Sequence, residues 1–145
     1  LRANDVFDVF SINIYRFEPP ADQIRRIYDL VRKPVMIGEF HFGAPERGLA
    51  PSLVMVKNQT ERGAAYQYYV ERAAAQPVAI GTHYFQLCDQ PVTGRFDGEN
   101  YNLGFLNVVD LPYPELVRFA KETHRRVHAV HAGKIEPTQR MAQVR

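Results

Sequence analysis

An apolar run early in the chain reads Lys33-Pro34-Val35-Met36-Ile37-Gly38-Glu39-Phe40-His41-Phe42-Gly43. It is rich in β-branched and aromatic residues and is bounded by Pro and Gly, so it predicts a strand. Because side chains alternate along a strand, Ile37, Glu39 and His41 are expected to share one face. A carboxylate is costly to bury at the end of such a strand unless it is paired or solvated. Glu39 is therefore either a structural carboxylate, which caps a helix or meets an Arg, or a catalytic group.

Two further apolar runs predict strands, and helical spacing fills the intervals between them. The strands are expected within residues 6–15 and 78–87. Apolar residues recur at spacings of three and four in the three segments 20–32, 60–75 and 114–132, as they do in helices. Thr60 is a candidate N-cap and Gly133 a candidate C-cap. The alternation of strand and helix indicates a parallel sheet covered by helices.

The spacing of these units favours part of a TIM (β/α)₈ barrel. A barrel unit averages roughly 30 residues, and a complete barrel has about 250. The 145-residue chain is therefore expected to hold three βα units of an incomplete barrel in residues 1–133, followed by a tail or linker in residues 134–145. An open doubly wound sheet is the alternative. Its nucleotide-binding version has no support, because the sequence has neither a GxGxxG motif nor a P-loop.

Composition excludes several classes of protein. Apolar residues make up 46% of the chain and charged residues 23%, and the formal net charge is +2, which are ordinary values for a globular protein. Cys88 is the only cysteine, so an intramolecular disulfide and a CxxC metal site are excluded. No apolar run approaches the roughly 20 residues that span a bilayer. The basic residues of the C-terminal segment are scattered around a predicted helix and its end, which favours a solvated surface, so we expect neither a membrane nor a nucleic-acid partner.

Polar residues mark the end of the first predicted strand. Ser11, Asn13 and Tyr15 share one face of that strand, and buried polar groups need hydrogen-bond partners. These partners are neighbouring strands, water or a ligand. Tyr15, at the carboxyl end, is placed to donate its phenolic O–H to a carboxylate on the next strand. The polar face is either an internal layer of the fold or one wall of a site.

The third predicted strand continues into a segment that mixes aromatic, amide and charged residues. Its members include His83, Tyr84, Phe85, Gln86, Asp89, Arg95, Glu99 and Asn100. Such mixtures recognise sugars, because aromatic faces pack against C–H groups while planar polar groups bind hydroxyls. An ordinary polar loop is the alternative. A calcium loop is disfavoured, because the spacing fails the EF-hand pattern.

Three histidines fall on the last predicted helix. His124, His128 and His131 stand at i, i+4 and i+7, so they are able to share a face and to hold zinc together with a further ligand. The HExxH motif is absent, and histidines that border the apolar stripe of the helix are the favoured interpretation. We expect no metal and no cofactor.

The three strand segments resemble the C-terminal part of a clan-A glycoside hydrolase barrel, and they are most similar to the β-agarases of glycoside hydrolase family 50. The resemblance is carried by residues 8–15, 33–40 and 81–100. It implies that the predicted strands are the sixth, seventh and eighth of the barrel. It also implies a retaining β-glycosidase acting on a neutral, agarose-like β-galactan. Glu39 would be the nucleophile, and Tyr15 would help to hold it ionised.

The resemblance extends to residues expected to bind substrate. These are Asn13, Tyr15, His41, His83, Tyr84, Phe85, Gln86, Asp89, Arg95, Glu99 and Asn100. The second catalytic glutamate of such enzymes lies on strand four, which this chain lacks, so the chain alone is expected to be inactive. Related barrels carry a Trp on strand eight. This sequence has no Trp and offers Tyr84 there, with Phe85 and Tyr101 as further platforms.

An incomplete barrel needs something to cover its open sides. We expect the missing N-terminal half or self-association to do so, and we expect the isolated chain to be insoluble, molten or oligomeric. The chain begins at Leu1 without an initiator Met, which indicates a boundary within a larger parent. That parent would be secreted or periplasmic in a bacterium. The alternatives are a non-catalytic carbohydrate-binding or structural remnant of such a barrel, and an unrelated α/β protein.

Overall fold

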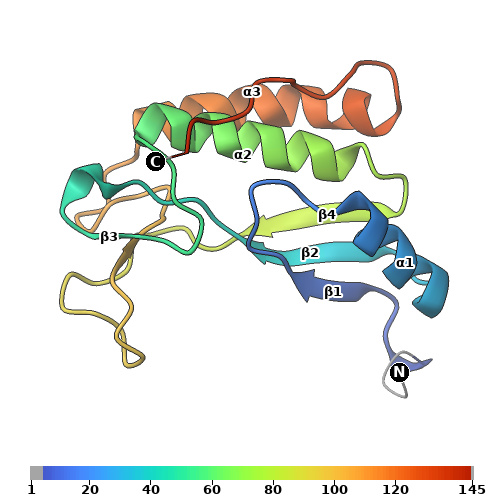
Figure 1. Cartoon of the computed structure of the whole chain (residues 1–145), viewed down its shortest axis with the longest axis horizontal. Coiled ribbons are helices and arrows are strands. Elements are labelled where there is room, and N and C mark those ends of the chain that lie inside the picture. Colours follow the sequence, from blue (N-terminus) through green and yellow to red (C-terminus); the bar gives the residue numbers. More distant parts are fainter. Residues whose placement is uncertain (1–4, 145) are drawn as a thin grey trace.

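A three-stranded parallel sheet lies at the centre of the computed structural model, which describes residues 5–144. In spatial order, its strands are β1 (Phe10–Asn13), β2 (Val35–Phe40) and β4 (Ala79–Tyr84). All three point the same way (Figure 1). A separate two-stranded parallel sheet pairs β3 (Ala50–Pro51) with β5 (Tyr101–Asn102).

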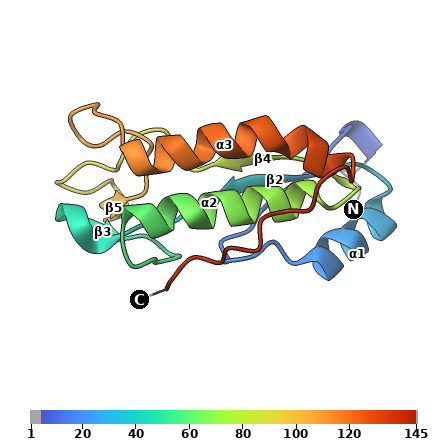
Figure 2. The same cartoon turned by 90° about the horizontal axis from the view of Figure 1, so that it is seen from above.

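Helices follow the strands, as the sequence predicts. They are α1 (Ala21–Val31), the short 3₁₀ helix η2 (Pro45–Arg47), α2 (Gln59–Ala74) and α3 (Pro114–His131). Helices α2 and α3 lie side by side over the sheet (Figures 1 and 2). The N-cap of α2 is Asn58 and not Thr60, because the Asn58 side chain accepts the Glu61 N–H at 2.9 Å. No helix within residues 5–144 is long and apolar enough to cross a bilayer.

The prediction of an incomplete (β/α)₈ barrel is wrong. The chain forms a small α/β domain in which the central sheet is open, with β1 and β4 at its edges. The segments that follow β2 and β4 pair with each other as β3 and β5 and form a sheet of their own. Alternating strands and helices determine that neighbouring strands pair in parallel, but not how many strands a sheet has or whether it closes.

Aromatic rings fill the space between the sheet and the helices. Phe40 of β2 stacks on Tyr69 of α2, with ring centroids 4.4 Å apart. Tyr84 of β4 packs edge-to-face against Phe40 at 5.2 Å and against Tyr66 at 5.5 Å. Burying a ring of this size contributes roughly 2–3 kcal/mol, so these contacts are a large part of what holds α2 against the strands.

Helix α2 is buried along most of its length, charged residues included. The exposed fractions of Glu61, Arg62 and Glu71 are 8%, 0% and 0%. Charged groups are tolerated at such positions only when other groups pair with them. Each of the three therefore needs a partner from another part of the chain.

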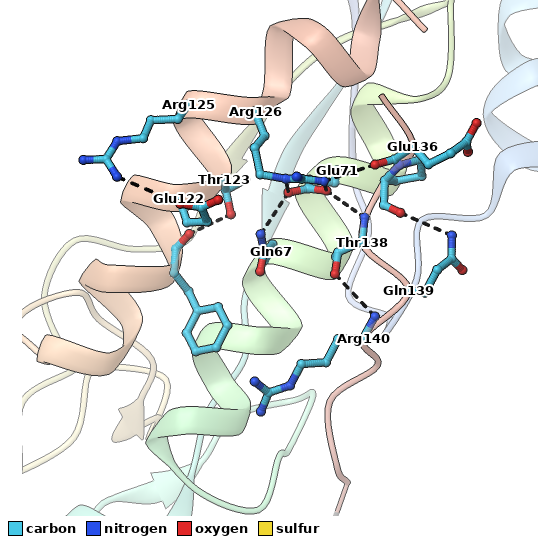
Figure 3. Close-up of polar contacts among 12 residues, drawn as sticks. Gln67, Glu71, Glu122, Thr123, Arg125, Arg126, Glu136, Thr138, Gln139 and Arg140 are labelled. Carbon is cyan, nitrogen blue, oxygen red and sulfur yellow. Dashed lines mark hydrogen bonds and ion pairs between the residues drawn. The ribbon is translucent and has the colours of Figure 1, made fainter. Parts of the chain in front are cut away.

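Three segments meet at Glu71 (Figure 3). Its carboxylate accepts hydrogen bonds from Arg126 of α3 at 2.8 Å, from Gln67 at 3.0 Å and from the backbone N–H of Thr138 at 2.7 Å. Burial alone would raise the pKa of Glu71. The hydrogen bonds from these three groups and the positive charge of Arg126 outweigh burial and hold the pKa below its ordinary value.

The end of the chain forms an ordered C-terminal strap, residues 135–144, that runs along α2 (Figure 2). Besides the Thr138 contact, Glu61 accepts a hydrogen bond from Arg140 at 3.1 Å and one from the backbone N–H of Gln143 at 2.8 Å. Val144 forms a β-bridge with Val56. Two buried carboxylates of one helix therefore hold the strap in place.

Replacing Glu71 by Gln is expected to destabilise the chain by about 2 kcal/mol at pH 7. The amide keeps the shape of the side chain but loses the charge opposite Arg126, and it places an NH₂ group among donors. Urea unfolding at fixed protein concentration measures the change. Because the native pKa of Glu71 is depressed, its contribution is present above the ordinary value of 4.5 and is lost as the pH falls through the native pKa. The difference between the two proteins should therefore shrink in acid.

Glu122→Gln is the matched control for this experiment. The Glu122 carboxyl lies on α3 and is half exposed, and its ion pair with Arg125 is long, at 3.9 Å. Loss of its charge should therefore change the unfolding free energy by less than about 0.5 kcal/mol. Equal effects of the two substitutions would contradict the assignment of Glu71 as an anchor for α3 and the strap.

Candidate functional site

The carboxyl ends of β1 and β2 bring Tyr15 and Glu39 together. Glu39 is the cross-strand partner of Asn13, and its carbonyl accepts the backbone N–H of Ile14 at 2.9 Å. Tyr15 follows directly, and its hydroxyl donates a hydrogen bond to Glu39 Oε2. The predicted contact between Tyr15 and a carboxylate on the next strand is confirmed.

Tyr15 stays protonated in this contact. Burial is the largest influence that raises the pKa of its phenol, and the hydrogen bond to Glu39 and the charge of that carboxylate raise it further. The phenol is therefore a lasting donor to one carboxylate oxygen. Among residues 5–144 no donor contacts the other oxygen, Glu39 Oε1.

Asn13 lies exposed beside the same strand end. It leans over Gly38 of β2, where an added Cβ would come within 2.9 Å of the Asn13 Oδ1 atom and 2.4 Å of the Ser11 Oγ atom. The glycine therefore lets the polar face of β1 approach the strand that carries Glu39.

His41 lies behind Tyr15 in the wall of the site. Its ring centroid is 4.7 Å from that of Tyr15, 6.1 Å from that of Phe85 and 6.4 Å from that of Tyr101. Its Nε2 accepts the backbone N–H of Leu53 at 3.3 Å. The side chain is only 2% exposed, so it supports the site from within and does not lie on its open surface.

The imidazole of His41 is neutral at ordinary pH. Burial is the main cause and lowers its pKa to about 4. The Phe85 carbonyl opposes this effect, and the charge of Arg62 adds to it. Since Nε2 accepts a hydrogen bond, the proton resides on Nδ1.

A turn in the loop after β4 brings two more charges close to Tyr15. Arg95 forms ion pairs with Asp97 at 2.6 Å and with Glu99 at 3.6 Å, and Gln90 donates to Glu99 at 2.7 Å. The charges of Glu99 and Arg95 act on the pKa of the Tyr15 phenol, the first raising it and the second lowering it. The turn therefore lies within electrostatic range of Tyr15.

Asp89 serves the framework of the loop and is 7% exposed. Its carboxylate accepts hydrogen bonds from the backbone N–H groups of Leu103 and Gly104 at 2.9 and 2.7 Å. It also accepts from the Asn102 side chain at 2.9 Å and from the Tyr113 hydroxyl at 2.5 Å. With four donors bound, Asp89 closes the base of the loop.

Arg62 is a residue that the sequence interpretation missed. Its guanidinium donates to Gln59 at 2.9 Å and to the Gly104 carbonyl, and it lies 4.9 Å from the ring centroid of Tyr113. Gln59 in turn donates to Asn102 at 2.7 Å. Helix α2 thus holds the far end of the loop whose base Asp89 closes. A buried Arg inside a helix gives no local signal in the sequence.

Other predicted sugar ligands lie elsewhere. The Tyr84 ring packs in the core, and its hydroxyl donates to the Phe42 carbonyl at 3.1 Å. His83 is exposed and, one residue earlier on β4, faces the other side of the strand. Gln86 donates to the Cys88 carbonyl at 3.1 Å, and the Asn100 carbonyl accepts the Ala50 N–H at 3.2 Å. The structure therefore places Phe85 near His41 and brings Arg95 and Glu99 within electrostatic range of Tyr15, whereas Tyr84 packs in the core.

A hollow of about 290 Å³ lies between α2, α3 and β4, away from Glu39. It contains the histidines of α3, of which His124 bonds the Tyr66 hydroxyl at 2.9 Å and His131 the Ala74 carbonyl at 2.8 Å. Within residues 5–144 no group of three His, Cys, Asp or Glu side chains is placed to hold a metal ion. This hollow has no carboxylate in its wall, so we place the candidate site at Glu39.

Comparison with known proteins shows that homologues of this chain are β-agarases. The chain is 38% identical over 129 residues to β-agarase B of Vibrio sp. strain JT0107, a match that covers 88% of this chain and 14% of that protein. It is 40% identical over 124 residues to β-agarase A of the same organism, covering 81% and 12%. It superposes on the structure of an exo-β-agarase with a TM-score of 0.84 at 39% identity, covering 90% of this chain and 18% of the other.

No protein-family profile matches the chain. The chain spans 12–14% of the length of the two Vibrio relatives. The similarity therefore confirms β-agarases as relatives of these residues, as the resemblance implies.

His41 is expected to make folding depend on pH. Its pKa is about 4 in the native chain against 6.5 when unfolded, so the unfolded chain binds the proton first and native stability falls as the pH drops below 6.5. The loss between pH 7 and pH 5 should be about 2 kcal/mol. His41→Gln, whose amide does not titrate, should lack this slope in urea unfolding experiments.

His83→Gln, which removes an exposed imidazole, is the control and should keep the slope of the unaltered chain. An unchanged slope in His41→Gln would show that the buried imidazole is not the group responsible.

Proposed function

We propose that this chain carries the nucleophile of a retaining β-glycosidase that hydrolyses a neutral, agarose-like polysaccharide. The observation that carries the proposal is the hydrogen bond from Tyr15 to Glu39 at the carboxyl ends of neighbouring parallel strands. That edge of a sheet is where α/β proteins bind ligands. The similarity to β-agarases supports an agarose-like polysaccharide as the substrate class.

In the proposed reaction Glu39 attacks the anomeric carbon. The bond from Glu39 Oε1 to that carbon forms as the glycosidic C–O bond breaks, and the leaving oxygen takes a proton from a second carboxylic acid. Water then displaces Glu39 from the same carbon and gives a proton back to the second carboxylate. Two displacements in sequence retain the configuration of the sugar.

Tyr15 has two tasks in this scheme. By holding Oε2 it fixes the plane of the carboxylate, so that Oε1 is the oxygen presented to substrate. It also stabilises Glu39 as a leaving carboxylate in the second displacement. A phenol whose pKa is raised performs both tasks over the whole working pH range, because it does not ionise there.

The second carboxyl group is proposed to come from outside residues 5–144. A retaining pair stands about 5–5.5 Å apart. Glu99, whose charge reaches Tyr15, is occupied by Gln90 and Arg95, so it suits a role in holding the loop better than a role as an acid. The Vibrio relatives are several times longer than this chain, which leaves room for a second glutamate.

The surroundings of Glu39 suit a neutral sugar. Phe85 and Tyr101 offer half-buried rings for C–H contacts. Arg95 and Glu99 offer planar groups for hydroxyls, and because they are paired with each other they present little net charge. An acidic sugar would find no unpaired cation among these residues.

We also infer that the open sheet is covered in the whole protein. Strands β1 and β4 each have an edge without a strand partner among the described residues. Exposed edges of this kind promote association. Another part of the polypeptide or a second copy of the chain is the proposed cover, and the isolated chain is therefore still expected to associate with itself.

Glu39→Gln in the whole protein is expected to lower the turnover of agarose at least about a thousandfold, because an amide is a poor nucleophile. The melting temperature should stay within a few degrees, because the amide oxygen still accepts the hydrogen bond from Tyr15. Release of reducing ends measures the rate. Proton NMR of the first product should show the β-anomer.

Glu46→Gln is the matched control, since Glu46 follows the same strand and the hydrogen bond that it accepts from the Gln59 N–H at 2.7 Å is one that an amide oxygen also accepts. It should keep nearly full activity. More than a tenth of normal turnover in Glu39→Gln, or brisk turnover by the 145-residue chain alone, would contradict the proposal. Oligosaccharide binding that survives Glu39→Ala in a protein without turnover would favour a non-catalytic binding function.

A further inference from the structure

Phe96 lies almost entirely in water. Its exposed fraction is 98%, the highest of any large apolar side chain in residues 5–144. It stands in the long loop that follows β4, which projects beyond the carboxyl ends of the strands (yellow in Figure 1). A ring in this position contributes almost nothing to the core, because burial is what stabilises apolar side chains.

The turn that carries Phe96 is nevertheless well fixed. The backbone N–H of Arg95 donates to the Glu99 carbonyl at 2.8 Å, and that of Gly98 donates to the Arg95 carbonyl at 2.9 Å. Gly98 has a φ of 86°, which favours glycine. Side-chain ion pairs of Arg95 with Asp97 and Glu99 also link the two sides of the turn. Phe96 is therefore presented by a braced turn.

Arg95 links Phe96 to the site. Its guanidinium lies 5.7 Å from the ring centroid of Phe96 and 5.8 Å from that of Phe85. Phe85 follows β4 directly and packs near His41. The charge of Arg95 also reaches Tyr15, the partner of Glu39. Ring, guanidinium and ring thus form a strip that leads outward from the Tyr15–Glu39 pair.

We propose that Phe96 is an outer platform on which a galactose ring of the polysaccharide stacks, at a distance from the bond that Glu39 attacks. This inference rests on the proposed hydrolase function. A neutral pyranose presents a face of C–H groups that suits an aromatic ring. The carboxylates of Asp97 and Glu99, in the same turn, are groups that accept hydrogen bonds from its hydroxyls. The platform would bind long polysaccharide chains, whereas the shortest substrates would not reach it.

The test compares substrates of different length in the whole protein. Phe96→Ala should lower kcat/KM for agarose about five- to tenfold, because a lost aromatic stack is worth about 1 kcal/mol. It should leave kcat/KM for the shortest oligosaccharide that the protein cleaves unchanged. Phe96→Trp should restore activity on agarose, since Trp offers a larger face. Because the ring is exposed, none of these changes should alter folding.

Val92→Ala is the matched control, since Val92 is an exposed apolar residue of the same loop, 63% exposed, without a ring. Binding without turnover is measured by depletion onto insoluble agarose in the Glu39→Gln background, where Phe96→Ala should weaken retention about fivefold. Unchanged kcat/KM on agarose, or equal losses on long and short substrates, would overturn the platform. Absence of agarose hydrolysis by the unaltered protein would instead overturn the proposed function.

Discussion

Three charged side chains buried on α2 are the constraint on which the rest of this structure depends. A buried charge without a partner costs several kcal/mol, so each of these groups has to recruit a different part of the chain. Glu71 holds α3 and the C-terminal strap, Glu61 holds the end of the strap, and Arg62 holds the loop after β4. The aromatic packing of α2 on the sheet completes the arrangement.

The same network determines where the candidate site lies. Arg62 holds the Gly104 carbonyl, and Asp89 holds the neighbouring N–H groups, so both ends of the loop after β4 are fixed to the framework. The turn of Arg95 and Glu99 is part of that loop, and its charges act on Tyr15. His41 completes the wall as a neutral, buried ring. Buried residues thus fix the positions of the polar side chains at the candidate site.

Local patterns in the sequence predicted much of this. Strand periodicity and parallel order place Glu39 beside the end of β1, which is why the Tyr15 contact followed from residue types alone. The helices agree with the predicted ones to within one or two residues. Gly133, predicted to end the last helix, has a φ of 65° just beyond α3.

What the sequence did not reveal depends on contacts between distant residues. Closure of the sheet is not encoded in the alternation of strands and helices, so the barrel expectation was wrong. The pairing of β2 with β4 is irregular between Ile37 and Phe40, and Tyr84 turns into the core, although its residue type suits a sugar platform. The framework role of Asp89 arises from donors 13 to 24 positions away, which no local pattern reveals.

Glu39 is proposed to form a covalent bond with the sugar during the reaction. Trapping with a 2-deoxy-2-fluoro galactoside that has a good leaving group, followed by proteolysis and mass spectrometry of the whole protein, tests it directly, because the fluorine slows release of the glycosyl-enzyme. One fluorogalactosyl adduct is expected, on the peptide that contains Glu39. An adduct on a different carboxylate, or the release of an inverted product by a protein that never becomes labelled, would contradict it.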